Sequence, residues 1–157
     1  MVTTSSPQVT AASSGGWLGV VGSRESLDRL LQDGEHWWCL PAGAQVGAFV
    51  AMYCTGQASK TQQGVFAVFR LEAFDAERNV ECKRYGSSSG YGSTAFARLS
   101  LVKRVDPPLA SKLLRSDPVL STAQCVRRSF QGTFFALEAR EIKRLLRLTG
   151  AADSPGA

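Results

Sequence analysis

Short apolar runs that begin or end at glycine or proline predict a series of β-strands along this chain. They cover residues 17–22, 46–53, 64–71, 94–105 and 133–137. In the fourth run, side chains alternate between two faces, as expected for a strand with one face buried. Leu99, Leu101 and Val105 fall on one face, and Phe96, Arg98 and Ser100 fall on the other. Pro107-Pro108 is expected to break this strand.

Apolar residues at helical spacing predict three helices between these strands. Leu27, Leu30 and Leu31 form one face of a first helix, which Ser23 caps and which ends near Gly34. A short second helix contains Leu109, Leu113 and Leu114 and ends before Asp117-Pro118. The third covers residues 138–148, with Ile142, Leu145 and Leu146 inward and Arg140, Lys143, Arg144 and Arg147 outward.

The predicted order is β-α-β-β-β-α-β-α, without an internal repeat. Short mixed strands with flanking helices favour an α+β fold, in which a strongly bent sheet or open barrel carries the helices. Residues 1–16 contain no charged side chain and are rich in Ser, Thr, Ala and Gly, so we expect a disordered tail. Residues 150–157 are expected to form a second tail, which leaves one domain over residues 17–149.

Composition narrows the class of protein. A chain of 157 residues with 44% hydrophobic residues can bury a core without staples. Its apolar stretches are all shorter than the ~20 residues of a membrane span, so no membrane partner is expected. The net charge of +5 raises the odds of an anionic partner.

The cysteines and the single histidine argue against a metal site. Cys39, Cys54, Cys82 and Cys125 show no C-x-x-C spacing, and His36 has no second imidazole beside it. We therefore expect four reduced thiols, no metal and no cofactor, although the even number leaves two disulfides possible. Reduced thiols favour an intracellular location, cytoplasmic first, with a nuclear or mitochondrial one left open.

Catalytic patterns are absent from the sequence. It contains neither a Gly-x-Ser-x-Gly elbow nor a phosphate loop ending in Gly-Lys-Ser/Thr. Its acidic residues lie mostly in helices and loops, as on solvated faces. The expectation is a protein that is not an enzyme.

Three segments carry residues suited to binding a base or a phosphate. Trp37-Trp38 can offer a stacking face, although adjacent strand residues point to opposite sides, so one of the pair is expected in the core. The segment 127–132 places Arg127 and Arg128, whose planar guanidinium groups suit phosphate, beside an aromatic residue and a glycine. It is equally compatible with a solvated loop. The loop 84–93, with Tyr85 and Tyr91, can close over a base or be disordered.

Taken together, these motifs resemble the EVE domain, a family of the PUA-like superfamily related to YTH domains. The resemblance rests on Trp17–Ser23, on Trp38-Cys39-Leu40-Pro41 as a Trp-x-x-Pro turn, on Val46–Tyr53 and on Gly64–Phe69. Residues 98–114 and 127–146 resemble the later segments of the family. The resemblance implies a PUA-like open barrel that holds a modified or flipped base in an aromatic pocket.

Carried onto this sequence, the resemblance implies a set of site residues. Trp38 matches the stacking tryptophan, which leaves Trp37 as the core residue. The base-binding residues are Gly22, Ser23, Trp38, Tyr85, Tyr91, Ser129 and Phe130, and the phosphate-binding residues are Arg127 and Arg128. The sequence departs from the family pattern where Gly22 replaces a lysine and Ala48 an aspartate.

The leading hypothesis is a non-catalytic nucleic-acid-binding module, a reader of a modified base in RNA or DNA. The alternative is a structural or protein-interaction subunit of a ribonucleoprotein complex, with a degenerate pocket. A small hydrolase on the same fold is the third hypothesis.

Overall fold

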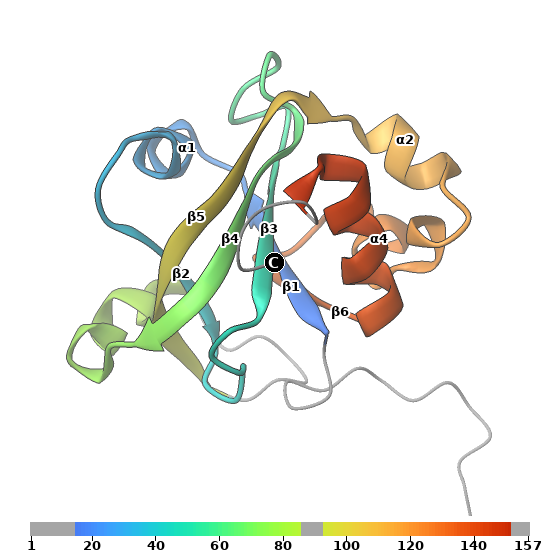
Figure 1. The fold of residues 1–157 in the computed structure, drawn as a ribbon. Coiled ribbons are helices and arrows are strands. Elements are labelled where there is room, and N and C mark those ends of the chain that lie inside the picture. The colour runs from blue at the N-terminus through green and yellow to red at the C-terminus, as the bar shows by residue number, and fades with distance from the viewer. Residues whose placement is uncertain (1–14, 86–92, 152–157) are drawn as a thin grey trace, which may run out of the picture.

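The computed structural model describes residues 15–85 and 93–151, which fold around one curled sheet (Figure 1). Six strands lie in the order β2-β5-β4-β3-β1-β6. Neighbouring strands are antiparallel except β1 and β3, which run parallel. The strands are β1 (Gly16–Val21), β2 (His36–Pro41), β3 (Phe49–Cys54), β4 (Gly64–Phe74), β5 (Thr94–Leu109) and β6 (Phe134–Leu137).

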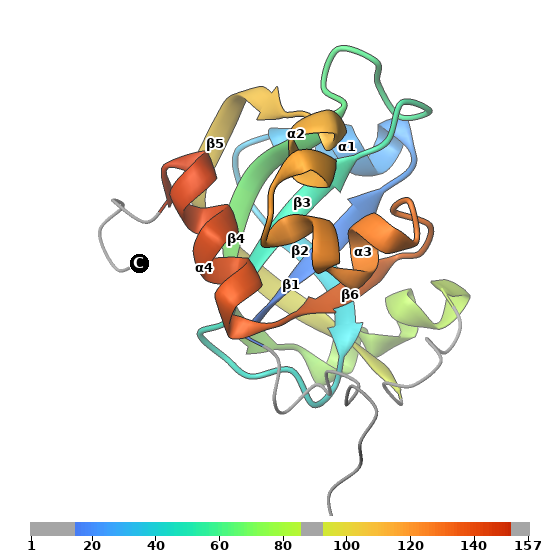
Figure 2. The same cartoon turned by 90° about the vertical axis from the view of Figure 1, so that its right-hand side faces the viewer.

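Helices cover both faces of the sheet. Figure 1 shows α1 on one side of the sheet and α2 and α4 on the other, and in Figure 2 α2, α3 and α4 lie together in front of the strands. The α-helices are α1 (Arg24–Leu31), α2 (Ser111–Ser116), α3 (Gln124–Arg127) and α4 (Ala139–Thr149). Two 3-10 helices, η1 (Ala76–Tyr85) and η2 (Leu120–Thr122), complete the described elements. The predicted α+β fold with a bent mixed sheet and flanking helices is confirmed.

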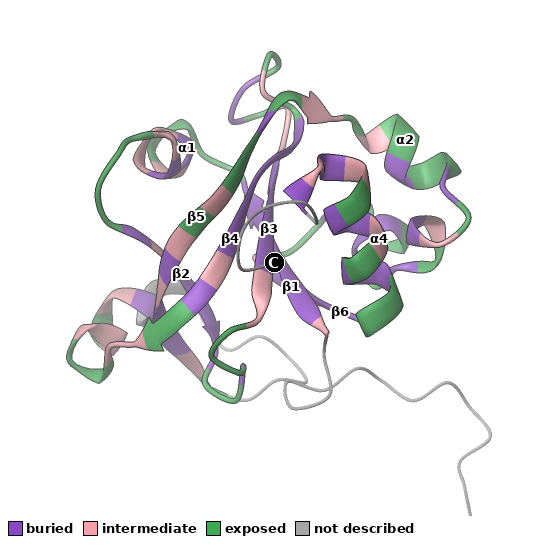
Figure 3. Cartoon of the chain, viewed as in Figure 1, coloured by how far each residue is buried: buried purple, intermediate pink, exposed green. Residues whose placement is uncertain are grey.

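The sheet separates two hydrophobic cores, and β1 contributes to both (Figure 3). Trp17 and Val21 belong to the inner core, to which α1 contributes Leu27 and Leu30. Leu18 and Val20 belong to the helix-side core, under α2 to α4. A strand buried on both faces reads as an unbroken apolar run, which is how β1 reads in the sequence. Each fully buried leucine or phenylalanine contributes roughly 2 kcal/mol.

Register shifts explain the curl of the sheet. The β4–β5 ladder is interrupted at three points and the β3–β4 ladder at one. Each such bulge bends its strand and increases its local twist. Leu101 leaves the predicted buried face in this region and is 41% exposed, because the register changes between its pair with Phe69 and the next pair.

Residues 39–41, after α1, belong to a strand and not to the expected turn. They complete β2, which pairs with β5 along its whole length. Most of this strand is buried on both faces, so its sequence lacks the alternation that marks a half-exposed strand. Pro41 is tolerated because it ends the strand, opposite Thr94.

The two prolines do not end β5, so the predicted break is wrong. The strand continues to Leu109, with a cis peptide bond between Asp106 and Pro107. Successive ladder pairs join Ala67 to Arg104 and Val65 to Leu109, so the prolines sit in a bulge where the ladder needs no N–H. Helix α2 therefore begins later than predicted, at Ser111.

Capping residues mark the start of α1 and both ends of α4. Ser23 caps α1, and its Oγ accepts a hydrogen bond from the Ser26 N–H at 3.2 Å. Helix α4 begins with a capping box between Glu138 and Glu141 and ends at Gly150, which has a φ of 82°. Residues 1–14 and 152–157 of the two expected tails lie outside the described residues.

Candidate nucleic-acid interface

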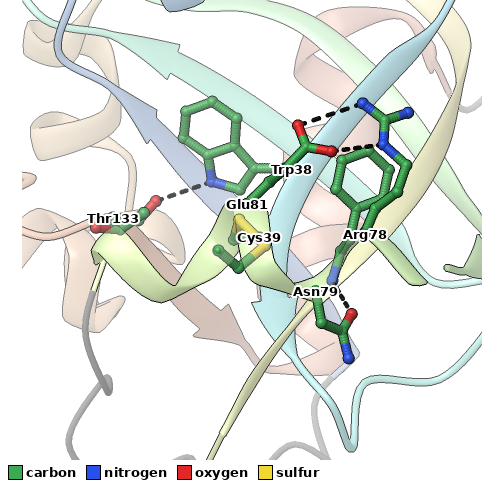
Figure 4. The surroundings of a disulfide bond; sticks show 8 residues. Trp38, Cys39, Arg78, Asn79, Glu81 and Thr133 are labelled. Carbon is green, nitrogen blue, oxygen red and sulfur yellow. Dashed lines mark hydrogen bonds and ion pairs between the residues drawn. A yellow bond between two sulfur atoms is a disulfide. The ribbon is translucent and has the colours of Figure 1, made fainter. Parts of the chain in front are cut away.

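Trp38 lies at the floor of the candidate site. Strand alternation in β2 turns its side chain into the inner core, where it is 5% exposed. The indole Nε1 donates a hydrogen bond to the Thr133 carbonyl at 3.2 Å (Figure 4). Gly19 leaves room for this ring, because a Cβ at that position would lie 3.1 Å from Nε1 and 2.6 Å from the Met52 sulfur.

Trp37 occupies the opposite face of β2. Its ring stacks on Phe96 at 4.6 Å between centroids, and the Arg29 guanidinium lies 4.0 Å from its centroid. Trp37 is half-buried, whereas Trp38 is buried. The resemblance left Trp37 as the core residue and Trp38 as the platform, and the relative burial is the reverse. Successive side chains of a strand point to opposite faces, so the two tryptophans are separated, but only tertiary packing decides which face is covered.

A small apolar crevice lies beside the Trp38 indole. It is lined by Trp37, Trp38, Cys39 and Thr133. It has no room for a water molecule. A base can reach the Trp38 indole only if the segments around the crevice separate.

A disulfide closes one side of this crevice. Cys39 in β2 is bonded to Cys82 in η1, with 5.6 Å between the Cα atoms (Figure 4). The expectation of four reduced thiols is therefore wrong for this pair. The two residues are 43 positions apart, so their spacing gives no sign of contact. Cys54 and Cys125 are free and buried, as expected of small apolar residues.

Ion pairs hold η1 against the edge of the sheet. Arg78 pairs with Glu81 at 2.6 Å and with Glu35 at 2.8 Å, and its guanidinium lies 4.2 Å from the Phe96 centroid. Arg98 also pairs with Glu35. Hydrogen bonds from Arg78 and Arg98 lower the pKa of the Glu35 carboxyl. The cations beside η1 are thus neutralised by neighbouring carboxylates.

Gly22 and Ser23 lie where β1 ends, close to the end of β3. The Thr55 N–H donates to the Val21 carbonyl at 3.0 Å, which fixes the two strand ends side by side. A Cβ on Gly22 would meet no atom within 4 Å, so the backbone there faces open space. Ser23 is exposed, and its hydroxyl still has a proton to donate while its oxygen caps α1.

Thr55 is a residue that the sequence analysis missed. Its Oγ1 is buried and has no hydrogen-bond partner within the described parts of the chain. Buried hydroxyls nearly always have a partner, so this one stands out at the candidate site. A threonine directly after an apolar strand carries no distinctive sequence signal.

The closing loop, residues 127–132, approaches Trp38 through Thr133. The Thr133 carbonyl accepts hydrogen bonds from the Val20 N–H at 2.9 Å and from the Trp38 indole. Arg127, Arg128 and Ser129 are exposed in this loop. Because Thr133 directly follows the loop and bonds to Val20, the loop ends beside β1.

Phe130 lies on the other side of the sheet from Trp38. Its ring stacks on Tyr53 at 3.8 Å, with 4° between the planes, inside the helix-side core. Ser129 and Phe130 have φ angles of 54° and 59°, a left-handed conformation that is costly for residues other than glycine. The structure therefore does not bring Phe130 together with Trp38.

The two tyrosines cannot be placed at the site. Tyr85 ends η1, but its side chain lies outside the described residues, as does Tyr91. Their role in base binding stays a prediction.

The described residues contain little catalytic chemistry. Burial raises the pKa of the Cys125 thiol to about 12 and raises that of the Cys54 thiol, so both stay protonated at neutral pH. A protonated buried thiol is a poor nucleophile. Over residues 15–85 and 93–151, no three His, Cys, Asp or Glu side chains gather closely enough to hold a metal ion. In the same ranges, no helix has the length and apolarity needed to cross a membrane.

The fold is shared with several solved structures, although no family model and no curated protein matches the sequence. A hypothetical protein from Leishmania major aligns at 16% identity and a TM-score of 0.59, over 90% of this chain and 98% of that one. The human THYN1 protein, in complex with DNA containing 5-methylcytosine, aligns at 12% identity and a TM-score of 0.57, over 87% and 98%. A variant of the ASCH protein from Zymomonas mobilis aligns at 17% and 0.52, over 88% and 99%. At these identities the likeness shows that this chain shares the fold of these proteins.

Proposed function

We propose that this chain is a non-catalytic module that binds nucleic acid and holds a modified base against Trp38. The observation that carries the proposal is the crevice beside Trp38, because Thr133, one of its lining residues, directly follows the loop that bears two exposed arginines. Further support comes from the shared fold, because the human THYN1 protein was solved with DNA containing 5-methylcytosine.

In this proposal each group has a separate role. The base stacks on the Trp38 indole, which contributes roughly 1–3 kcal/mol. The Ser23 hydroxyl donates to the edge of the base, and the open space at Gly22 lets the base approach the main chain. Arg127 and Arg128 bind the flanking phosphates.

Entry of the base requires the crevice to widen. The Trp38 indole must give up its hydrogen bond to the Thr133 carbonyl, which keeps its second donor, the Val20 N–H. Extracting a base from a duplex costs a few kcal/mol, so single strands and weakened base pairs are the favoured substrates.

The test is a titration of labelled oligonucleotides at fixed salt. DNA and RNA, single- and double-stranded, carry either cytosine or 5-methylcytosine at one position. Trp38→Phe keeps an aromatic ring in the core but reduces the stacking area and removes the indole N–H. The matched control is Trp37→Phe, on the other face of the same strand.

We expect Trp38→Phe to weaken binding about tenfold, while Trp37→Phe leaves it within about twofold, since tenfold corresponds to ~1.4 kcal/mol. Circular dichroism melting confirms that both variants are folded. Absence of binding by the wild type, or equal loss in both variants, would contradict the proposal.

The alternative function is a protein-interaction subunit of a ribonucleoprotein complex that has lost the pocket. The narrowness of the crevice and the deep burial of Trp38 favour it. It predicts a co-purifying protein partner and no salt-dependent affinity for free oligonucleotides.

A further inference from the structure

Among the described lysines and arginines, some form ion pairs with carboxylates and others do not. Those beside η1 and β2, Arg78 and Arg98, are neutralised by ion pairs. On the helix-side layer, the exposed cations of α2 and the closing loop form no ion pair with any described carboxylate. This group, the α2–loop surface, consists of Lys112, Arg115, Arg127 and Arg128.

Phe130, in the closing loop, contacts Arg115 of α2 and so brings the loop and the helix together. The Arg115 guanidinium in α2 lies 5.9 Å from the Phe130 centroid. Two residues before Phe130 is Arg128, in a turn closed by the bond from the Phe130 N–H to the Cys125 carbonyl at 2.8 Å. The stack of Phe130 on Tyr53 anchors this turn to the sheet. Arg115 therefore lies beside the closing loop, although 12 positions separate it from Arg127 in the sequence.

A largely buried ion pair fixes α2 to the helical layer. Asp117, directly after α2, accepts hydrogen bonds from the Val119 and Leu120 N–H groups at 3.1 and 3.0 Å. Its second oxygen accepts from Arg144 of α4 at 2.8 Å. A fixed α2 holds Lys112 and Arg115 in place before any ligand arrives, which lowers the entropic cost of binding.

Unneutralised guanidinium groups on a rigid surface suit a chain of phosphates. Arg presents a planar fork of donors that matches phosphate oxygens. The charge of Arg127 also acts on the carboxyl of the buried Glu141, with which it forms no ion pair. The strongest influence on Glu141 is burial, which raises its pKa. Lys112, Arg115, Arg127 and Arg128 thus give this surface four positive charges.

We propose that the nucleic-acid strand runs from the closing loop across α2, and that Arg115 binds a backbone phosphate of this strand, with Lys112 one turn further along. The inference rests on the proposed function and adds the path of the strand. It also assigns Arg115 as a phosphate-contacting residue.

The experiment measures oligonucleotide affinity as a function of salt for the wild type, Arg115→Gln, Arg115→Lys and Arg147→Gln. Arg147 is an exposed arginine in the last turn of α4, so its substitution removes the same charge. In Figure 2, α4 lies on the opposite side of the helical layer from α3. The probe is a 12-nucleotide single strand with one 5-methylcytosine.

For a single strand, loss of one phosphate contact makes the negative slope of log K against log salt less steep by about 0.7. We expect this change for Arg115→Gln, together with about fivefold weaker binding at 0.1 M salt. Arg115→Lys keeps the slope because it keeps the charge. Arg147→Gln keeps both slope and affinity.

Two outcomes separate the two hypotheses. If the wild type binds and Trp38→Phe weakens it, but Arg115→Gln behaves as Arg147→Gln, the strand path is wrong and the proposed function stands. If the wild type binds no oligonucleotide, both fail. Preferential binding of a poly-glutamate peptide over the oligonucleotide would also overturn the phosphate assignment.

Discussion

The ion pair between Asp117 and Arg144 offers the clearest test of how the helical layer is held. Arg144→Met keeps the aliphatic stem of the arginine but removes its charge. The Asp117 side chain is 4% exposed, so the substitution leaves a buried carboxyl without its cation. The two backbone N–H groups of residues 119 and 120 would be its remaining donors.

The expected loss follows from burial. Removing one partner of a fully buried pair costs about 3–5 kcal/mol. The Arg144 side chain is 36% exposed, so water screens this pair from one side. We therefore expect Arg144→Met to lower the free energy of unfolding by about 2 kcal/mol at pH 7.

The pH dependence gives this prediction a sign. The hydrogen bond from Arg144 lowers the pKa of Asp117 below the ordinary value of 3.8, and the two backbone hydrogen bonds add to the effect. A lowered carboxyl pKa stabilises the fold above the unfolded value, and this contribution is lost as the pH falls below it. The difference between wild type and Arg144→Met should therefore shrink below about pH 4.

Urea unfolding followed by tryptophan fluorescence, at pH 7 and pH 3, measures both quantities. The double variant Arg144→Met with Asp117→Asn tests the coupling, because removing both charges should recover part of the loss. Ordinary surface substitutions change stability by about 0.5 kcal/mol or less. A loss within that range at pH 7, or a loss of the same size at both pH values, would refute the reasoning.

Three further predictions concern the Cys39–Cys82 disulfide, Thr55 and Gly19. Cys39→Ser with Cys82→Ser should lower the free energy of unfolding by about 3 kcal/mol, because the disulfide closes a long loop; chemical denaturation measures it. Thr55→Val should raise the free energy of unfolding by about 1 kcal/mol, since it removes a buried hydroxyl without a described partner; calorimetry measures it. Gly19→Ala should destabilise by about 2 kcal/mol, because its Cβ would crowd the indole; thermal unfolding measures it.

Each of these predictions has a matched control. Reducing agent should destabilise the wild type but leave the double serine variant unchanged. Thr61→Val, at an exposed position where water can replace the bond to the Ser59 hydroxyl, should change stability little, and a clear loss in Thr55→Val would mean that its hydroxyl has a partner. Gly22→Ala, where a Cβ meets no atom within 4 Å, should fold as well as the wild type. Equal losses at Gly19 and Gly22 would contradict the crowding argument.

Local signals in the sequence account for much of the fold. The apolar run of β1, the cap at Ser23 and the apolar stripe of α4 depend on neighbours in the chain, and they were predicted with nearly correct bounds. The β2 strand was missed because both of its faces are covered, which removes the alternation. The prolines of β5 misled the prediction because a bulge accommodates them.

The candidate site divides along the same line. The sequence by itself determined that Trp37 and Trp38 point to opposite faces if they lie in a strand, and that Arg127 and Arg128 precede a glycine, since both follow from positions within one segment. Only the tertiary structure decided which tryptophan is covered, that Cys39 meets Cys82, and that Arg115 joins the closing loop. These contacts join segments far apart in the chain, and a single sequence carries no local signal of which distant surfaces pack together.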